Sequence, residues 1–356
     1  MAGMTPPLNL GFVVNFEPSD PPGRWLGLYL PEDRYRTELL TAVAPRDSIW
    51  ERHGWLPPYL REFLHLARRR PRLDSFDILF TWELRNTLAT ILLRRLTNQR
   101  RARVVSLNPM VKGWAALALP LVRVLLRDAD RIVLFSTAEQ GTVSRQLRLP
   151  PERFQFVPRF AEARAATMEN AAAHGGPFVL ALGHSNRDFP TFWEALRGTD
   201  VRVVMYRNPW MHGRELPNVH AIPALLPSVD EAALVAQAAF HVIPLKAAEF
   251  SSGLTVLLRA MAAGKAVIVS DTTGISDYVR DGETALLVPP GDAAALRDAM
   301  LRLWRDPQER ERLGRNAAQV VRDQFAAPNF AFHLARIAQD VVAAAQSFEE
   351  MQCESL

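Results

Sequence analysis

Short β-rich runs alternate with helical patterns along almost the whole chain, and this alternation restricts the fold more than any other feature of the sequence. The runs predict strands at residues 10–16, 76–81, 104–107, 132–136, 154–157, 178–182, 201–205, 219–222, 241–244, 266–270 and 285–288. Helical patterns fill the intervals, at residues 85–96, 115–127, 190–196, 230–238, 254–263, 275–279, 293–305, 308–323 and 329–347. Strands that alternate with helices form parallel sheets with helices on both faces, so the sequence predicts an α/β fold.

The chain is long enough for two such units. Its 356 residues exceed the size at which a single core stops growing. An alanine-rich, polar stretch at residues 159–176 interrupts the alternation, which is typical of a domain boundary. We therefore expect one Rossmann-like domain at residues 1–165, a second at 166–328, and a C-terminal helix at 329–356 that returns to the first domain. Ligands in such folds bind at the carboxyl ends of the strands.

Composition excludes several classes of protein. Apolar residues make up 48% of the chain and charged residues 22%, which excludes a disordered or collagen-like protein. The single cysteine, Cys353, excludes a disulfide framework and a thiolate metal site. The nearest approach to a spanning segment, residues 113–126, is interrupted by Pro120 and Arg123, and no signal-peptide pattern is present. We expect a cytoplasmic protein.

Positive charge is concentrated in the first half. Residues 1–165 contain 25 Lys and Arg against 16 Asp and Glu, whereas residues 166–356 contain 17 against 22. Such a half attracts nucleic acid, acidic lipid headgroups or a phosphorylated acceptor. Because the chain has only three lysines, arginines at ordinary surface positions are the alternative. We expect no nucleic acid, and peripheral contact with the inner face of the membrane, on which residues 113–126 would lie unless they form a buried helix.

The strongest functional signal is the run PLKAAEFSSGLTVLLRAMAAGKAVIVSD at residues 244–271. It predicts a strand, a polar loop and an apolar helix that starts near Gly253 and ends at Gly264. The N–H groups at a helix start hold an anion, most simply a diphosphate, and glycine lets a ligand approach the backbone closely. The alternative is ordinary capping of the helix by Ser251 or Ser252.

Residues 244–271, together with TGISDYVRDGETALLVPPGD at 273–292, resemble the C-terminal signature of the group 1 glycosyltransferases, also called family 4. The runs RDPQERERLGRN at 305–316 and ADRIVLFS at 129–136 extend the resemblance. It implies the GT-B fold, in which two Rossmann-like domains face each other across a cleft. It also implies a hexosyltransferase that moves a sugar from a nucleotide-diphosphate sugar to an acceptor hydroxyl with retention. The sequence does not identify the acceptor, which can be a glycan, a lipid or a small molecule.

The resemblance also implies which residues bind the donor. In the family a basic residue after a glycine-ended strand neutralises the diphosphate; here Gly183 ends that strand, Arg187 is the candidate catalytic cation and His184 is a further donor-binding residue. A planar guanidinium can bind two phosphate oxygens, and a solvent-facing arginine beside Asp188 is the alternative. At the helix start the implied donor-binding residues are Ser251, Ser252, Gly253, Leu254 and Thr255.

The family's two glutamates, which hold the transferred sugar and the ribose hydroxyls and are separated by seven residues, have no full counterpart here. Glu249 and Arg259 are separated by nine residues, and strict spacing places Ser251 at the first position. We prefer Glu249 as the catalytic residue that holds the sugar, because a carboxylate accepts bonds from two hydroxyls, although the loop must then bulge by two residues. Arg259 has no hydrogen-bond acceptor. We expect Arg259 either to turn toward the phosphate as a donor-binding residue or to take no part in binding the ribose. In the second case Asp271, Asp277 or the backbone binds the ribose hydroxyls.

The first half lacks the family's histidine near the reacting carbon. The run DILFTWELRN at residues 77–86 places Glu83 at the carboxyl end of a strand, where it can act as a base toward an acceptor hydroxyl or be an exposed residue at a helix start. Trp25 can stack on a sugar or fill the domain core. Asp128 and Asp130 precede a strand, so we expect no metal site. We expect no resident cofactor either, since the nucleotide sugar is a co-substrate.

Two alternatives to a transferase stay open. The missing second glutamate and the missing histidine are compatible with a catalytically inactive GT-B-like subunit that binds a partner. The fold also supports other reactions, such as epimerisation of a nucleotide sugar.

Overall fold

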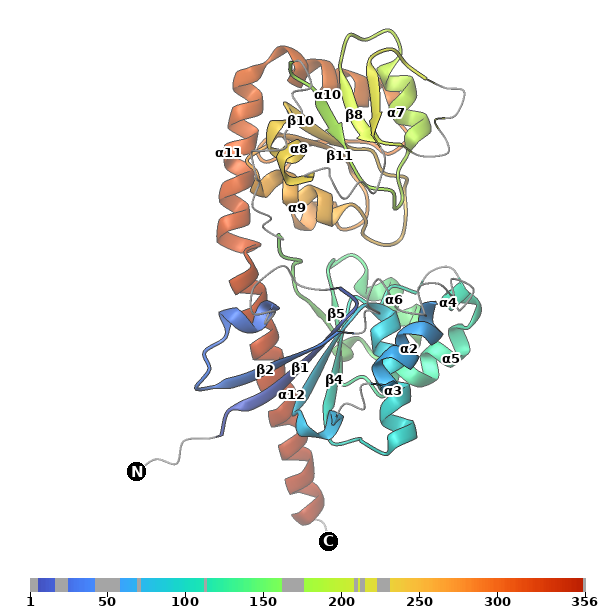
Figure 1. Ribbon diagram of the computed structural model, residues 1–356, viewed down its shortest axis with the longest axis vertical. Coiled ribbons are helices and arrows are strands. Elements are labelled where there is room, and N and C mark those ends of the chain that lie inside the picture. Colours follow the sequence, from blue (N-terminus) through green and yellow to red (C-terminus); the bar gives the residue numbers. More distant parts are fainter. Residues whose placement is uncertain are drawn as a thin grey trace. The chain divides into compact units, whose positions relative to one another are not determined.

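The computed structural model describes residues 6–16, 25–41, 58–68, 72–111, 114–161, 176–207, 211, 215–222 and 231–354. The chain divides into two compact units (Figure 1). The first comprises Met1–Val157 and Pro328–Leu356, and the second comprises Pro158–Ala327. Each unit has its own sheet and its own helices.

A six-stranded parallel sheet forms the centre of the first unit. Its strand order is β2-β1-β3-β4-β5-β6, and every pairing is parallel. The strands are β1 (Leu8–Val14), β2 (Tyr35–Thr41), β3 (Ile78–Trp82), β4 (Arg103–Leu107), β5 (Arg131–Leu134) and β6 (Phe154–Phe156).

The two faces of this sheet bury alternate residues of the same strands. On one face Leu79, Val104 and Ile132 pack against helices, namely α2 (Pro58–Arg68), α3 (Glu83–Thr97), α5 (Leu119–Leu126) and α6 (Gln140–Leu147). On the other face Phe80 stacks on Phe12 with ring centroids 5.3 Å apart.

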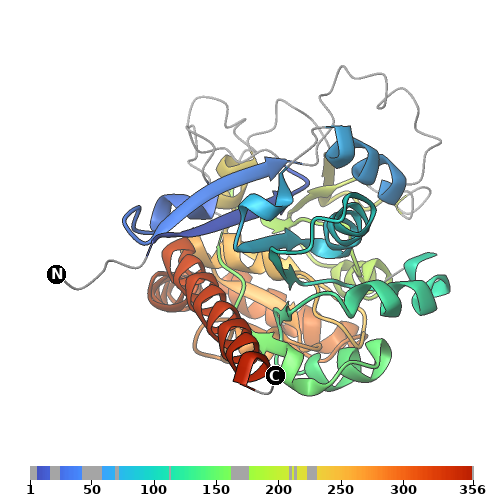
Figure 2. The same ribbon diagram turned by 90° about the horizontal axis from the view of Figure 1, so that it is seen from below.

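The C-terminal helix α12 (Ala327–Glu354) belongs to this second, aromatic face. Figure 2 shows it beside the sheet, opposite the layer of α3 and α5. Its Phe330 meets Trp82 at 6.4 Å and Phe135 at 6.0 Å between ring centroids. Gln339 Nε2 also donates a hydrogen bond of 2.7 Å to the Tyr35 hydroxyl. Aromatic packing and one polar contact therefore fix α12 on the first unit.

The aromatic face also decides the position of Trp25. Its ring meets Trp82 at 5.3 Å and Phe12 at 5.8 Å between centroids, both edge to face. Edge-to-face contacts of this kind add to the stability gained by burying the rings. Trp25 is therefore half-buried and packs against the aromatic core of the first unit, which favours the second of the two sequence-based alternatives.

The second unit repeats the plan with a sheet of strand order β12-β11-β10-β7-β8-β9. All pairings are parallel. The strands are β7 (Val179–Ala181), β8 (Val203–Tyr206), β9 (Val219–Ile222), β10 (Phe240–Ile243), β11 (Val267–Ser270) and β12 (Leu286–Val288).

Helices cover both faces of this sheet as well. Val179 and Val203 face a core shared with α7 (Phe189–Leu196) and α10 (Ala293–Arg305). Leu180 and Val204 face a second core shared with α8 (Glu231–Gln237), against which α9 (Leu254–Ala262) packs. Helix α11 (Pro307–Gln324) lies against α9. The predicted α/β fold is confirmed.

Some predicted elements differ from the structure. The sequence did not predict β2, α2 or α6. The helix expected at residues 275–279 is a single 3₁₀ turn, η6 (Ile275–Asp277). The helix expected at 115–127 is divided at Ala118 into α4 (Trp114–Leu117) and α5, and Pro120 occupies the first turn of α5. None of the helices in the described ranges combines the length and hydropathy needed to cross a bilayer.

Candidate functional site

Two loops at the carboxyl edge of the second sheet are bonded to each other. The loop of residues 182–188 follows β7, and the loop of residues 244–253 follows the neighbouring strand β10. Lys246 N donates to Asn186 O at 3.1 Å, and the Asn186 amide donates to Lys246 O at 2.8 Å and to Ser252 Oγ at 3.1 Å. We call these two segments the paired loops. They bring the residues predicted around Arg187 and around Gly253 into one structure.

Helix α9 begins directly after the second of the paired loops. Its N-terminal cap is Gly253, whose φ of 78° lies in the left-handed region that favours glycine. Within the described ranges, the N–H groups of Leu254 and Thr255 have no hydrogen-bond acceptor. Ser252 Oγ accepts a bond from the loop amide of Asn186 and does not cap the helix. The helix therefore presents N–H groups that can bind an anion.

Arg187 is buried against its own loop. Its Nε donates to Leu182 O at 3.0 Å and its Nη1 donates to Ser185 O at 2.9 Å, while the side chain is only 6% exposed. Burial lowers the pKa of the guanidinium to about 10. Nη2 lies over Gly183, where any Cβ would collide with it, and has no hydrogen-bond partner within the described ranges. The alternative of a solvent-facing arginine is wrong.

A third group of side chains lies at the end of β8. The His184 ring stacks on the Tyr206 ring, with centroids 5.4 Å apart and planes at 9°. The Tyr206 hydroxyl donates to Glu231 Oε2 at 2.6 Å, and Arg259 Nη1 donates to Glu231 Oε1 at 2.7 Å. We call His184, Tyr206, Glu231 and Arg259 the Glu231 cluster. Arg259, at the position of the family's second glutamate, thus pairs with a carboxylate from α8.

Glu249 stands apart from these contacts. It is exposed and forms no hydrogen bond or ion pair with any described residue. Its loop is held just before it, where Thr273 Oγ1 donates to Ala248 O at 2.6 Å. Ser251 and Leu254 on the far side of the loop are buried. The structure therefore places Glu249 on the surface of the second paired loop, and its role stays a prediction.

The first unit places Glu83 at the carboxyl end of β3, as the sequence predicted. Glu83 is the first residue of α3 and has a φ of 64°, a conformation that costs a non-glycine residue about 1 kcal/mol or more. Glu83 Oε2 accepts bonds of 3.3 Å from Asn15 Nδ2 and from Arg85 Nη2. Arg85 Nη1 also lies 2.9 Å from Oε1 of the buried Glu62.

Glu62 is the most perturbed acid of this group. Burial raises its pKa to about 7, against the attraction of Arg85 and with a further contribution from the negative charge of Glu83. Two carboxyls thus share one guanidinium at the edge of the sheet where ligands bind in folds of this type. Glu83 is therefore part of a polar cluster, and its role as a base stays a prediction.

The aspartates of the Asp128-Ala-Asp130 triplet have structural partners. Asp128 Oδ2 lies 2.8 Å from Arg95 Nε, and Asp130 Oδ2 accepts a 2.8 Å bond from Val104 N. The part of the chain that the structure describes contains no group of three His, Cys, Asp or Glu side chains placed to hold a metal.

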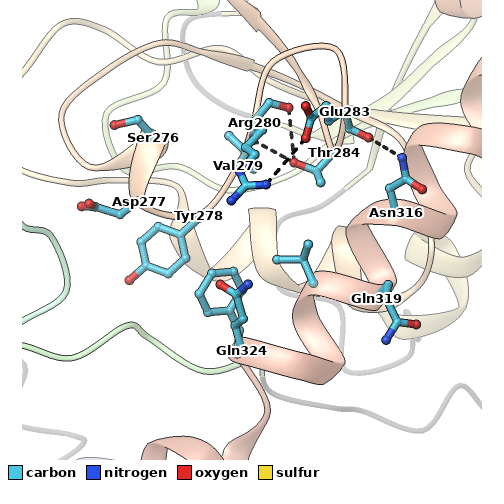
Figure 3. Close-up of a pocket in the computed structure, with 12 residues that line it drawn as sticks. Ser276, Asp277, Tyr278, Val279, Arg280, Glu283, Thr284, Asn316, Gln319 and Gln324 are labelled. Carbon is cyan, nitrogen blue, oxygen red and sulfur yellow. Dashed lines mark hydrogen bonds and ion pairs between the residues drawn. The ribbon is translucent and has the colours of Figure 1, made fainter.

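A pocket of about 380 Å³ lies elsewhere in the second unit, between the segment of residues 276–284 and α11. Figure 3 shows Arg280, Glu283 and Thr284 on one wall, with Asn316 of α11 donating to the Glu283 carbonyl at 3.0 Å. Of the residues considered for donor binding, only Asp277, an alternative for the ribose, lines this pocket.

Comparison with known proteins identifies the family. The model for glycosyl transferases group 1 matches residues 191–306. The D-rhamnosyltransferase WbpZ of Pseudomonas aeruginosa is 31% identical over 299 residues, which are 77% of this chain and 74% of that protein. The chain belongs to the group 1 glycosyltransferases. This glycosyltransferase is of the hexosyltransferase type.

Solved structures agree with this glycosyltransferase over nearly its whole length. Sucrose-phosphate synthase from Thermosynechococcus elongatus has a TM-score of 0.72 at 17% identity and covers 95% of this chain and 100% of its own. HepE of Anabaena in complex with UDP-glucose has a TM-score of 0.66 at 15% identity, covering 94% and 100%. The predicted family and the GT-B fold are confirmed. The alternative of a catalytically inactive subunit gains no support from these relatives.

Sequence reasoning missed three residues that the structure brings to the site. Asn186 joins the paired loops, and Tyr206 and Glu231 complete the Glu231 cluster. Tyr206 carried a usable signal, because it directly follows the strand predicted at residues 201–205, at the ligand-binding edge of the sheet. Asn186 and Glu231 carried none, since their contacts are with residues 60 and 28 positions away.

Proposed function

We propose that this glycosyltransferase takes its sugar from a nucleotide-diphosphate sugar and transfers it to an acceptor hydroxyl with retention. The observation that carries the proposal is the pair of anion-binding groups on the paired loops. One is the first turn of α9 after Gly253, and the other is the buried guanidinium of Arg187. The UDP-glucose complex of HepE, a structural neighbour, supports a donor of this class.

The chemistry follows from the position of these charges. When the bond between the sugar and the diphosphate breaks, negative charge accumulates on the leaving diphosphate. Arg187 is already held by Leu182 O and Ser185 O, and the N–H groups of α9 are fixed by the helix. Donors that are fixed before the reaction stabilise developing charge without a reorganisation cost, and each contributes about a hundredfold or more to the rate. We therefore propose a metal-independent reaction without a resident cofactor.

The other predicted residues take supporting roles in this proposal. Glu249 binds the hydroxyls of the transferred sugar, since an ionised carboxylate only accepts hydrogen bonds. Glu83 acts as a base toward the acceptor hydroxyl. The remaining donor-binding residues of the proposal are Gly183, His184, Ser251, Ser252, Leu254, Thr255 and Arg259.

The test starts with thermal unfolding in the presence of UDP, GDP and ADP, followed by product analysis with sugar conjugates of the nucleotide that binds. Mass spectrometry identifies the product, and NMR of its anomeric proton reports retention. Arg187→Ala should lower turnover at least about a hundredfold. Arg197→Ala, which removes an exposed arginine of the same unit, is the matched control. Normal turnover in Arg187→Ala, or no binding of any nucleotide by the wild-type protein, contradicts the proposal.

We also propose that the protein acts in the cytoplasm at the inner face of the membrane, where it meets its acceptor. Helix α5 buries Val122 and Leu125 but exposes Leu121 at 60%, and Leu117 of α4 is 87% exposed. Two exposed arginines, Arg127 and Arg148, directly follow α5 and α6. An apolar ridge with basic neighbours favours an anionic lipid surface.

Flotation with vesicles of 30% phosphatidylglycerol and 70% phosphatidylcholine tests the membrane proposal. The wild-type protein should float with the vesicles at low salt, and the double variant Leu117→Asp, Leu121→Asp should not. Leu60→Asp, which alters an exposed leucine of α2, is the control and should behave as wild type. Equal flotation of all three proteins, or none at any salt concentration, contradicts the membrane contact.

A further inference from the structure

The Glu231 cluster lies next to the proposed diphosphate site along one edge of the sheet. The central strands of the second unit are ordered β11-β10-β7-β8. The paired loops follow β10 and β7, and Tyr206 is the last residue of β8. A nucleoside attached to a diphosphate at the paired loops must extend along this edge, either toward β11 or toward β8.

The side chains at the two ends of this edge differ in what they offer a nucleoside. On the β11 side Ser270 is buried, and its hydroxyl accepts a 2.9 Å bond from Leu245 N, while the next residue, Asp271, exposes its carboxylate. On the β8 side the stacked rings of His184 and Tyr206 lie beside a carboxylate that is 24% exposed. Both sides therefore offer a carboxylate, and the stacked aromatic rings, together with the bonds that hold Glu231 in place, favour the β8 side.

We propose that Glu231 binds the ribose hydroxyls of the donor, and that Arg259 and Tyr206 are positioning residues that hold its carboxylate in place. This inference rests on the proposed nucleotide-sugar donor. Each carboxylate oxygen has two acceptor positions. The Tyr206 hydroxyl occupies one on Oε2 and Arg259 occupies one on Oε1. Counting only the described residues, one position is left on each oxygen, which matches the two donors of a vicinal diol.

The place of Arg259 on α9 supports this assignment. Arg259 follows Gly253 by six residues, which is about 9 Å along a helix axis. The ion pair therefore holds the carboxylate at a set distance from the helix start that receives the diphosphate. It also explains an arginine at this position of α9: the negative group comes from α8, and the arginine orients it.

The experiment measures how strongly the protein distinguishes a ribose from a deoxyribose. Isothermal titration first finds which of UDP, GDP and ADP the wild-type protein binds most tightly, and then compares that nucleotide with its 2′-deoxy and 3′-deoxy forms. We expect the wild type to bind at least one deoxy form about tenfold or more weakly, because hydrogen bonds to charged groups are lost. Glu231→Gln should bind the parent nucleotide weakly and show a ratio near one.

Two further variants separate ribose binding from a merely structural ion pair. Glu194→Gln removes an exposed glutamate of the same unit and should keep the wild-type ratio. Tyr206→Phe keeps the ring beside His184 but removes one positioning bond, so the ratio should fall about threefold or more. The double variant Glu231→Gln, Arg259→Glu places a carboxylate at position 259, on the other side of the contact with position 231. It should regain part of the difference in affinity between the parent nucleotide and its deoxy form.

The outcomes distinguish this inference from the proposed function. If the wild-type protein binds none of the nucleotides, the donor proposal itself fails. If it binds one of them and both Glu231→Gln and Tyr206→Phe keep the wild-type ratio, the donor proposal stands and the assignment of Glu231 is overturned. A ratio near one in Glu231→Gln, with the wild-type ratio in Glu194→Gln, supports the assignment.

Discussion

Glu62 makes the stability of the first unit depend on pH in a direction that the structure determines. Burial raises its pKa from 4.5 to about 7, because it outweighs the attraction of Arg85, 2.9 Å away, and because Glu83 adds negative charge. A carboxyl with a higher pKa in the folded chain than in the unfolded chain favours folding while it is protonated. Its contribution is therefore complete below pH 4.5 and is lost as the pH rises through 7.

The magnitude follows from the same two pKa values. One pKa unit corresponds to about 1.36 kcal/mol, so the change from 4.5 to about 7 corresponds to about 3 kcal/mol. Glu62→Gln replaces the carboxyl by a neutral amide of similar shape and removes this titration. Relative to that variant, the wild-type free energy of unfolding should fall by about 3 kcal/mol between about pH 4.5 and about pH 7.5.

Urea unfolding at a series of pH values, followed by tryptophan fluorescence, measures this difference. Subtracting the variant from the wild type at each pH cancels the titrations that the two proteins share. Glu152→Gln, at an exposed glutamate of the first unit, is the control and should differ from the wild type by a constant amount. A constant difference for Glu62→Gln as well would refute the reasoning, and a difference of opposite slope would mean that the attraction of Arg85 outweighs burial.

Three further predictions concern the second unit. His241 is wholly buried, and burial lowers its pKa from 6.5 to about 4, so its contribution to stability is present above pH 6.5 and is lost as the pH falls through 4. Between about pH 7 and about pH 4, the free energy of unfolding of His241→Leu should therefore fall by about 3 kcal/mol less than that of the wild type. Equal acid sensitivity of the two proteins in urea titrations would contradict this. Gly183→Ala would place a Cβ on Arg187 Nη2 at a φ of 90°. The melting temperature should fall because alanine is strained there, and titration of the folded variant should show nucleotide affinity at least about tenfold weaker; unchanged affinity would argue against the phosphate role. Gly314→Ala would place a Cβ on the carbonyl oxygen of Gly264 and should destabilise the unit by about 1–3 kcal/mol in thermal unfolding, whereas an unchanged melting temperature would show that α11 can shift.

Two of the elements that the sequence did not predict, β2 and α6, lack the local patterns on which the predictions depended. Strand β2 lies at the edge of its sheet, and its exposed Arg36 and Glu38 alternate with more buried residues, so it lacks the continuous apolar run that marks the buried strands. Helix α6 begins Gln-Gly-Thr-Val-Ser, and glycine and β-branched residues have low helix propensity. Burial of Leu147 at the C-terminal end of α6 stabilises this helix, which its local helix propensity does not favour. Strongly periodic segments such as α10 were predicted with the bounds found in the structure.

The candidate site was predictable where it depends on position along a strand, and not where it depends on tertiary contacts. The loops at residues 182–188 and 244–253 follow strands, where ligands bind in parallel sheets, and the resemblance to the group 1 glycosyltransferases selected them from the other loops of this kind. The partner of Arg259 depends on how α8 packs beside α9, which no local pattern encodes. The side-chain chemistry of Arg259 predicted only that it cannot accept the hydrogen bonds that a glutamate accepts at this position.

The bonds between Asn186 and the second loop have a consequence for how fast and how tightly a nucleotide associates. Because Asn186 links the two segments through Lys246 and Ser252, neither segment can open without breaking contacts with the other. Conformational entropy is then lost when the chain folds, and little is lost again when the nucleotide arrives. Association should therefore be a single kinetic step whose observed rate rises linearly with nucleotide concentration.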